Sequence, residues 1–263
     1  EGRELLATWA ATHGGTFTGL VIPNVFGPFG NPFYNSVIAT FSHQLNRGET
    51  PRIEIDATLK LIYVAELVQE FITCIRNHRN GAVHAAWPVA HTAEIRVTDI
   101  LQLLLSYRET YAEKGIIPAL ANRFEVNLFN TFRSYINHHT HFPVKYTQHT
   151  DQRGAFTEII RLNNGGQVSF SPTNPGITRG NHFHTRKIER FAVIKGEAVI
   201  SLRRIGTSDT MNFPLSGSEP AYVDMPVWYT HNITNTGTDE LYTMFWINEF
   251  YDPGDPDTYF EEV

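Results

Sequence analysis

The spacing of apolar residues changes near residues 138–145, and this change constrains the fold more than any other feature of the sequence. Before it, apolar residues three and four apart alternate with short strand patterns, as is typical of an α/β domain. After it, strand patterns follow one another at intervals of roughly ten residues, separated by Gly, Asn and Pro turns. We therefore expect an α/β domain over residues 1–138 and an all-β sandwich or barrel over residues 143–263.

The patterns also predict individual elements. We expect helices over residues 1–13, 34–45, 97–105 and 122–136, and a helix that continues from residues 61–68 through Cys74. Strand patterns cover residues 16–22, 52–56, 91–96, 155–162, 167–170, 190–195, 198–203, 221–223 and 241–247. Thr98 or Asp99 is expected to cap the helix over residues 97–105. The histidines between His138 and His141 are interpreted as a surface linker rather than a metal site, because no carboxylate accompanies them.

The composition excludes several classes of protein. The chain has 263 residues, a formal net charge of -6 and 41% hydrophobic residues, which is ordinary for a globular protein. It has no basic stripe to replace the counterions of a nucleic acid, so we expect no nucleic-acid partner. No apolar run reaches membrane-spanning length and no signal peptide is visible, so we expect no membrane insertion. A single cysteine, Cys74, excludes an intramolecular disulfide and fits a cytoplasmic protein.

The first residues have the pattern of a helix that is already under way. The chain begins with Glu1 rather than Met, and no capping residue precedes the apolar positions Leu5, Leu6 and Trp9. We expect that a preceding segment is missing, either through proteolysis or because the chain was delimited there.

Potential metal ligands are concentrated in the segment 180–196. His182 and His184 are two residues apart, so on a strand both imidazoles would point to the same face. Glu189 follows five residues later, and His231 comes after a proline turn further along the chain. Three imidazoles and a carboxylate suit zinc, iron, manganese or nickel. The alternative is that these histidines are polar residues at the edge of a sheet.

The segments 180–196 and 226–237 resemble the two signatures of the cupin superfamily, in the expected order. The resemblance implies a double-stranded β-helix, or jelly roll, for the all-β domain. It also implies that His182, His184, Glu189 and His231 are metal ligands.

A second resemblance overlaps the first. The segments 151–158 and 178–182 are similar to the Asp-x-Arg-Gly-x-Phe-x-Glu and Arg-Gly-x-His motifs of the nucleotide-sugar 3,5-epimerases, a branch of the cupins. This resemblance implies that Arg153 and Arg179 bind the substrate diphosphate, with Gln167 on the substrate side as well. It also implies that the histidine of the second motif is the base that removes the proton next to the substrate ketone.

The two resemblances assign different roles to His182. The classical epimerases of this branch use no metal, whereas an imidazole that is bound to a metal cannot accept a proton. His182 is therefore expected to be a ligand, a base, or each in a different state, and Tyr251 and Asp252 are further catalytic candidates. Tyr242 is a third such candidate. The metal would stabilise the enolate charge, or it would be a structural zinc with all four positions filled by protein.

The α/β half resembles the C-terminal part of the extended short-chain dehydrogenase/reductases, whose core is Rossmann-like. Three segments carry this resemblance: residues 20–28, 34–36 and 61–64. It implies that Asn24, Tyr34 and Asn35 bind substrate, and that Asn24 also lies beside the nicotinamide. The sequence contains neither a glycine-rich dinucleotide loop after a strand nor the Tyr-x-x-x-Lys pair of this family, so we expect a remnant without reductase activity.

A reductase segment followed by a cupin resembles the CapF/WbjC family of bifunctional capsular polysaccharide synthesis enzymes. This resemblance implies a zinc cupin that epimerises C3 of a UDP-4-keto-6-deoxy-N-acetylhexosamine. It also implies a reductase domain that reduces C4 with NADPH towards UDP-N-acetyl-L-fucosamine precursors, and a homodimer. Two alternatives remain open, a metal-dependent cupin oxygenase and a non-catalytic sugar-binding cupin.

Overall fold

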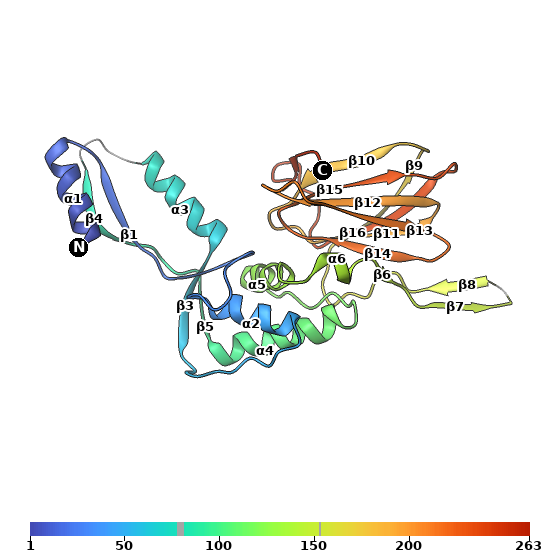
Figure 1. Cartoon of the computed structure of the whole chain (residues 1–263), viewed down its shortest axis with the longest axis horizontal. Helices are drawn as coiled ribbons and strands as arrows, with labels where there is room; N and C mark the ends of the chain where they lie inside the picture. Colours follow the sequence, from blue (N-terminus) through green and yellow to red (C-terminus); the bar gives the residue numbers. More distant parts are fainter. Residues whose placement is uncertain (78–81, 153) are drawn as a thin grey trace. The chain divides into compact units, whose positions relative to one another are not determined.

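The structure is a computed structural model that describes residues 1–77, 82–152 and 154–263 (Figure 1). The chain folds into two compact units, Glu1–Leu105 and Ser106–Val263. This division falls before the boundary predicted near residue 138, which stays a prediction for the functional domains. None of the helices in the described part of the chain has the length and apolar character needed to cross a lipid bilayer.

The first unit contains short helices and two small sheets. Its elements are α1 (Gly2–His13), β1 (Phe17–Val21), β2 (Asn24–Phe26), α2 (Val37–Asn46), β3 (Thr58–Tyr63), α3 (Val64–Arg76), β4 (Val83–Pro88), β5 (Ala93–Arg96) and most of α4 (Val97–Tyr107). Strands β1 and β4 pair in parallel, and β3 pairs in parallel with β2 and antiparallel with β5. The sequence patterns located α1, β1, α2, β5 and α4, and α3 in part, but they predicted neither β2 nor β4. Residues 61–63, expected to run into a helix, are the end of β3.

The strand predicted over residues 52–56 is wrong. These residues are irregular, and the strand begins only at Thr58. Ile55 is 78% exposed, so the alternating pattern does not correspond to a buried face. Asp56 instead caps α4, because its Oδ1 accepts a hydrogen bond from the backbone N of Thr98 at 3.0 Å. The cap that was expected from Thr98 or Asp99 thus comes from a distant loop.

The second unit combines a helical layer with two five-stranded sheets. Its helical elements are a π-helical turn η1 (Arg108–Ala112), α5 (Arg123–Arg133) and α6 (His138–His141). Its strands are β6 (Val144–Lys145), β7 (Gln148–Asp151), β8 (Gly154–Thr157), β9 (Gln167–Thr173), β10 (Thr178–Phe183), β11 (Glu189–Lys195), β12 (Glu197–Arg204), β13 (Thr210–Ser216), β14 (Ala221–Met225), β15 (Tyr229–Asn235), β16 (Leu241–Ile247) and β17 (Tyr259–Phe260). The strand predicted over residues 155–162 ends at Thr157.

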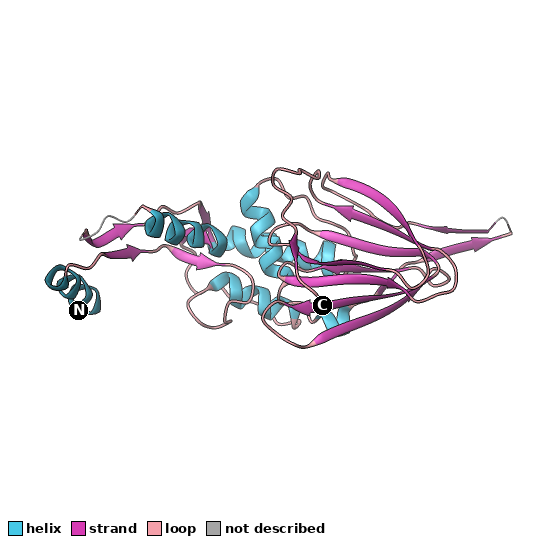
Figure 2. Ribbon diagram, turned by 90° about the horizontal axis from the view of Figure 1, so that it is seen from above, coloured by secondary structure: helices cyan, strands magenta, loops and turns pink. Residues whose placement is uncertain are grey.

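The two sheets of the second unit form a sandwich. One has the order β13-β12-β15-β10-β17 and the other β6-β14-β11-β16-β9, and all their paired strands are antiparallel. Figure 2 shows these strands as stacked layers. Ile200 and Leu202 of β12 are fully buried, as is Val193 of β11, so alternating apolar residues of both sheets form the core.

Contacts at a buried ion pair of the second sheet join the helical layer to that sheet. Arg190 Nε and Nη2 donate to Asp224 Oδ1 and Oδ2 at 2.7 and 2.9 Å, and these side chains are 1% and 0% exposed. The hydroxyl of Tyr111 donates to Asp224 Oδ2 at 2.7 Å, and Arg133 Nη2 donates to the carbonyl of Met225 at 3.0 Å. These contacts explain why the helices after Leu105 belong to the same compact unit as the sandwich.

The interpretation of His138–His141 as a surface linker is wrong for His138. These residues form α6, and His138 is only 5% exposed. Its ring stacks with Phe142 at a centroid distance of 5.9 Å and meets Tyr229 edge to face at 5.2 Å. Burial lowers the pKa of His138 to about 3, so it is a neutral core residue near pH 7.

Candidate metal centre

The four predicted ligands come from three adjoining segments of the sandwich. His182 lies on β10 directly opposite His231 on the neighbouring strand β15. His184 follows the end of β10, and Glu189 is the first residue of β11 in the other sheet. Antiparallel pairing therefore brings together residues that are about fifty positions apart in the sequence.

A bulge in β10 sets the direction of these side chains. The register shifts between Gly180 and His182, where the intervening Asn181 has a φ of 59°. Gly180 has a φ of 107°, and a Cβ there would lie 2.7 Å from the carbonyl oxygen of His231. Only glycine fits this position without a shift of β15.

The same register places Arg179 on the side of β10 that carries His182. Arg179 is opposite Ile233, and His182 is opposite His231, which precedes Ile233 by two positions. Partners in a ladder point to the same side and so do residues two apart, so Arg179 and His182 share the interior-facing side of the sheet. Arg179 is nevertheless exposed, which indicates that it lies at an open part of the sandwich.

The four side chains converge closely enough to hold one ion. One ligand atom from each of His182, His184, Glu189 and His231 lies within 4.8 Å of the others. Glu189 Oε2 is 3.0 Å from His184 Nε2 and 3.3 Å from His231 Nε2. These three buried atoms have no hydrogen bond of acceptable geometry among the described residues. A divalent cation would satisfy all of them, so the residues fit a metal.

Backbone carbonyls orient two of the imidazoles. His184 Nδ1 is 2.5 Å from the carbonyl oxygen of Asp257, and His231 Nδ1 is 3.3 Å from that of Tyr229. A carbonyl accepts a hydrogen bond, so we assign the proton to Nδ1 in both rings. The Nε2 lone pairs then point towards the cluster, as is usual for histidines that bind metals.

The charges of the cluster favour a cation. Burial lowers the pKa of His182 to about 4, with smaller contributions from His231 and His184, so this ring is neutral near pH 7. Burial would raise the pKa of Glu189, but the adjacent His184 and His231 outweigh it and lower this pKa, so the carboxylate is ionised. Burial opposes a charge on His184 as well, yet Glu189 raises its pKa. The cluster thus places an anionic carboxylate among imidazoles.

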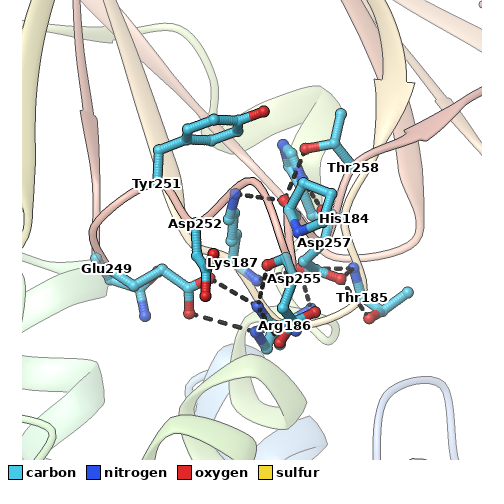
Figure 3. Close-up of polar contacts among 12 residues, drawn as sticks. His184, Thr185, Arg186, Lys187, Glu249, Tyr251, Asp252, Asp255, Asp257 and Thr258 are labelled. Carbon is cyan, nitrogen blue, oxygen red and sulfur yellow. Dashed lines mark hydrogen bonds and ion pairs between the residues drawn. The ribbon is translucent and has the colours of Figure 1, made fainter.

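Of the other predicted residues of this unit, the structure joins Gln167 and Tyr251. Gln167 Oε1 accepts a hydrogen bond from the backbone N of Tyr251 at 3.3 Å, so the structure brings these two together. Tyr251 and Asp252 are neighbours in the irregular segment after β16 (Figure 3). Tyr251 is 57% exposed, and the Oδ1 of Asp252 accepts a hydrogen bond from the Gly254 backbone N at 2.8 Å. Among the described residues, no hydrogen bond or ion pair joins Tyr251 or Asp252 to the four clustered side chains. Arg153 lies outside the described residues.

The substrate residues predicted in the first unit line one cavity. Asn24, Tyr34 and Asn35 surround a volume of about 380 Å³ together with the loop over residues 23–28. Asn24 lies on β2, and Asn35 has a φ of 52°, a conformation that asparagine tolerates better than most residues. The structure therefore brings these three predicted residues together.

Sequence reasoning missed Asp257, the residue whose carbonyl contacts His184. Asp257 is 73 positions from His184 and belongs to the irregular segment between β16 and β17. A backbone carbonyl carries no side-chain signal, so no sequence pattern could have identified it.

Two family models match this chain. The model of the polysaccharide biosynthesis C-terminal domain matches residues 149–259, and that of the NAD dependent epimerase/dehydratase family matches residues 1–90. The first range covers the sandwich with its candidate metal centre, and the second covers most of the first unit.

Known proteins match over longer ranges. A UDP-2-acetamido-2,6-beta-L-arabino-hexul-4-ose reductase from Pseudomonas aeruginosa is 33% identical over 240 residues, which are 90% of this chain and 63% of the relative. This chain therefore spans less than two thirds of that relative. The crystal structure of the capsular polysaccharide assembling protein CapF from Staphylococcus aureus is 36% identical, with a TM-score of 0.54, and the match covers 100% of this chain and 72% of that one. The spore coat polysaccharide biosynthesis protein SpsL of Bacillus subtilis is 24% identical over 43% of this chain and 82% of its own length.

Proposed function

We propose that this chain, which belongs to the family of the capsular polysaccharide assembling protein CapF, epimerises C3 of a UDP-linked 4-keto-6-deoxy-N-acetylhexosamine in its β-sandwich. The observation that carries the proposal is the convergence of His182, His184, Glu189 and His231 within 4.8 Å. The reductase from Pseudomonas aeruginosa is named for a UDP-linked 4-keto sugar, which supports this class of substrate. We place the reaction in the cytoplasm and expect a homodimer.

The chemistry begins with removal of the proton on C3, next to the C4 ketone. A divalent metal, zinc in the first instance, would be held by His184, Glu189 and His231, and would stabilise the negative charge that develops on the ketone oxygen. His182 supplies either the fourth ligand or the base, because its neutral imidazole can accept a proton when it is not coordinated. Arg179, which is exposed on the same side of β10 as His182, would bind the diphosphate, with Arg153 as its proposed partner.

Tyr251 and Asp252 are proposed to act on the opposite face of the sugar. Return of a proton to the other face of the enolate completes an epimerisation, and a phenol or a carboxylic acid can deliver it. Gln167 Oε1 accepts a hydrogen bond from the backbone N of Tyr251, which links a proposed substrate-binding residue to a proposed catalytic one.

Solvent exchange tests the proposal directly. NMR of UDP-4-keto-6-deoxy-N-acetylglucosamine in deuterium oxide, with zinc-loaded protein, should show deuterium entering C3. His182→Asn should abolish the exchange while zinc remains bound to the other three residues if His182 is the base. His184→Asn is the matched control and should lose zinc as well. Absence of deuterium at C3 with zinc-loaded wild-type protein would refute the proposed C3 epimerase activity.

The first unit is proposed to be the substrate side of an NADPH-dependent reductase for C4 of the same sugar. Asn24, Tyr34 and Asn35 would contact the sugar in their shared cavity, and Asn24 would also contact the nicotinamide. This sequence has no glycine-rich dinucleotide loop after a strand and no catalytic Tyr-x-x-x-Lys pair, so this chain should not oxidise NADPH. Loss of NADPH absorbance on addition of the 4-keto sugar would contradict the predicted lack of reductase activity.

An oxygenase is the second candidate, because three imidazoles and a carboxylate also suit iron. Oxygen uptake by the iron-loaded protein without exchange at C3 would favour it. Binding of metal and sugar with neither exchange nor oxygen uptake would indicate a non-catalytic sugar-binding protein.

A further inference from the structure

The carboxylate of Asp257 binds the loop that follows His184. Asp257 Oδ1 accepts hydrogen bonds from the backbone N and the hydroxyl of Thr185 at 3.1 and 2.6 Å. Its Oδ2 accepts from the backbone N of Arg186 at 3.0 Å and of Lys187 at 2.9 Å. Three consecutive backbone N–H groups therefore converge on one carboxylate, which fixes the conformation of the loop.

The same residue also holds the imidazole of His184. The Asp257 carbonyl oxygen is the partner of His184 Nδ1, and Asp257 is 1% exposed (Figure 3). Its φ of 40° is unusual for a residue other than glycine. The side chain and the carbonyl belong to one rigidly held residue, so the position of the carboxylate determines where the carbonyl meets the imidazole.

Neighbouring contacts connect the same two segments. Arg186 pairs with Glu249 and with Asp255, with Nη2 3.0 Å from a carboxylate oxygen of each. Lys187 Nζ donates to the carbonyl of Pro256. The Arg186 pairs are partly exposed and involve no atom of His184, so they provide a comparison for the role of Asp257.

We propose that Asp257 is a positioning residue that orients His184 for metal binding without being a ligand itself. The proposal rests on the proposed metal site and identifies a residue that controls its affinity. Asp257 fixes the loop through its carboxylate and selects the tautomer of His184 through its carbonyl, so that Nε2 points towards Glu189 and His231. Removal of the carboxylate should let the carbonyl and the loop shift, and the imidazole should lose its orientation.

The expected effect follows from the loss of a charged acceptor. In Asp257→Asn one oxygen is replaced by an NH₂ group, which donates and cannot accept from the loop N–H groups. Changes in the outer partners of metal-binding histidines typically weaken metal binding about 10–100-fold. We expect a loss of zinc affinity in this range, although all four clustered side chains are retained.

Zinc affinity measured by competition with a chromophoric chelator tests the proposal. Wild-type protein, Asp257→Asn and the matched control Asp255→Asn are compared at a temperature where circular dichroism shows each one folded. Asp257→Asn should lose about 10–100-fold in affinity, and Asp255→Asn should stay close to wild type. Cobalt-loaded Asp257→Asn should also show altered d–d absorption bands, because the geometry of one imidazole changes; a purely structural defect would leave these bands unchanged.

Thr185→Val keeps the test decisive if Asp257→Asn does not fold. It removes only the hydroxyl hydrogen bond to Asp257 and should weaken zinc binding in the same direction, by a smaller factor. Equal zinc affinity in wild type and the Asp257 or Thr185 variant would overturn the proposal, as would an equal loss in Asp255→Asn. A wild-type protein that binds neither zinc nor cobalt would overturn both the metal site and the positioning role of Asp257. The affinity results for the variants would overturn only the positioning role.

Discussion

Replacement of Asp224 by Asn should be among the most destabilising single changes in the second unit. The substitution keeps the shape of the side chain but leaves the guanidinium of Arg190 buried without its counter-ion. Breaking a buried pair in this way costs about 3–5 kcal/mol. For a unit of this size each kcal/mol lowers the melting temperature by roughly 2–4 °C, so a fall of roughly 6–20 °C is expected.

Thermal and urea unfolding followed by circular dichroism measure this effect. The control is Glu219→Gln, which removes an ion pair with Lys145 whose side chains are 70% and 71% exposed. It should leave the midpoint nearly unchanged, because exposed pairs contribute little to stability. If Asp224→Asn unfolds within about 2 °C of Glu219→Gln, less than one kcal/mol separates them and the buried pair does not hold the helical layer.

The same pair predicts how stability depends on pH. Burial would raise the pKa of Asp224, but Arg190 outweighs it and holds this pKa below its usual value. A carboxyl group with a lowered pKa in the folded state contributes stability above its unfolded pKa of about 3.9 and loses it as the pH falls through the folded pKa. Wild-type protein should therefore lose stability in acid, and Asp224→Asn should lose less over the same range.

Four further outcomes are expected. Gly180→Ala should weaken zinc binding, because the new Cβ would lie 2.7 Å from the carbonyl oxygen of His231, whereas Gly206→Ala, also at positive φ but in open space, should not; equal zinc affinities in chelator competition would contradict this. Glu189→Gln should lower zinc affinity, because it removes the negative charge of the cluster. Wild-type protein from which zinc has been removed by a chelator should melt at a lower temperature than protein with free zinc at 100 times Kd, and this difference corresponds to about 2.7 kcal/mol of folding free energy. Asn122→Ala should cost about 1 kcal/mol in urea unfolding, because the Asn122 side chain caps α5 by accepting from Glu125 N at 3.0 Å; an unchanged urea midpoint would show that this cap does not contribute.

Local signals in the sequence were sufficient for much of the fold and for the cluster. The spacing of His182 and His184 predicted that both would lie on one side of a strand. His184 in fact follows the end of β10, but the structure still brings both histidines close to Glu189 and His231, and the role of all four as ligands stays a prediction. The helix expected over residues 122–136 was also found, as α5 over Arg123–Arg133, and its apolar residues are three and four positions apart. These features share short sequence separation or a motif with fixed spacing.

Features that depend on tertiary contacts were not readable. The pattern over residues 52–56 alternates like a strand, but it has no sheet to join, and Asp56 serves a helix 42 positions away. His138 was expected at the surface, yet Phe142 and Tyr229 bury it. The contact between Asp257 and His184 joins a backbone atom to a side chain across 73 positions. In each case the partner is determined by the folded chain rather than by neighbouring residues.

The bulge at Asn181 decides where the positive charge of β10 lies. Arg179 and His182 are three positions apart, so a regular strand of the same sequence would direct them to opposite faces of the sheet. The bulge absorbs one residue and returns Arg179 to the side of His182. Straightening this strand would therefore carry the guanidinium from the opening of the sandwich to its outer surface with no change in composition. The charge of the opening thus depends on a backbone irregularity as well as on the arginine itself.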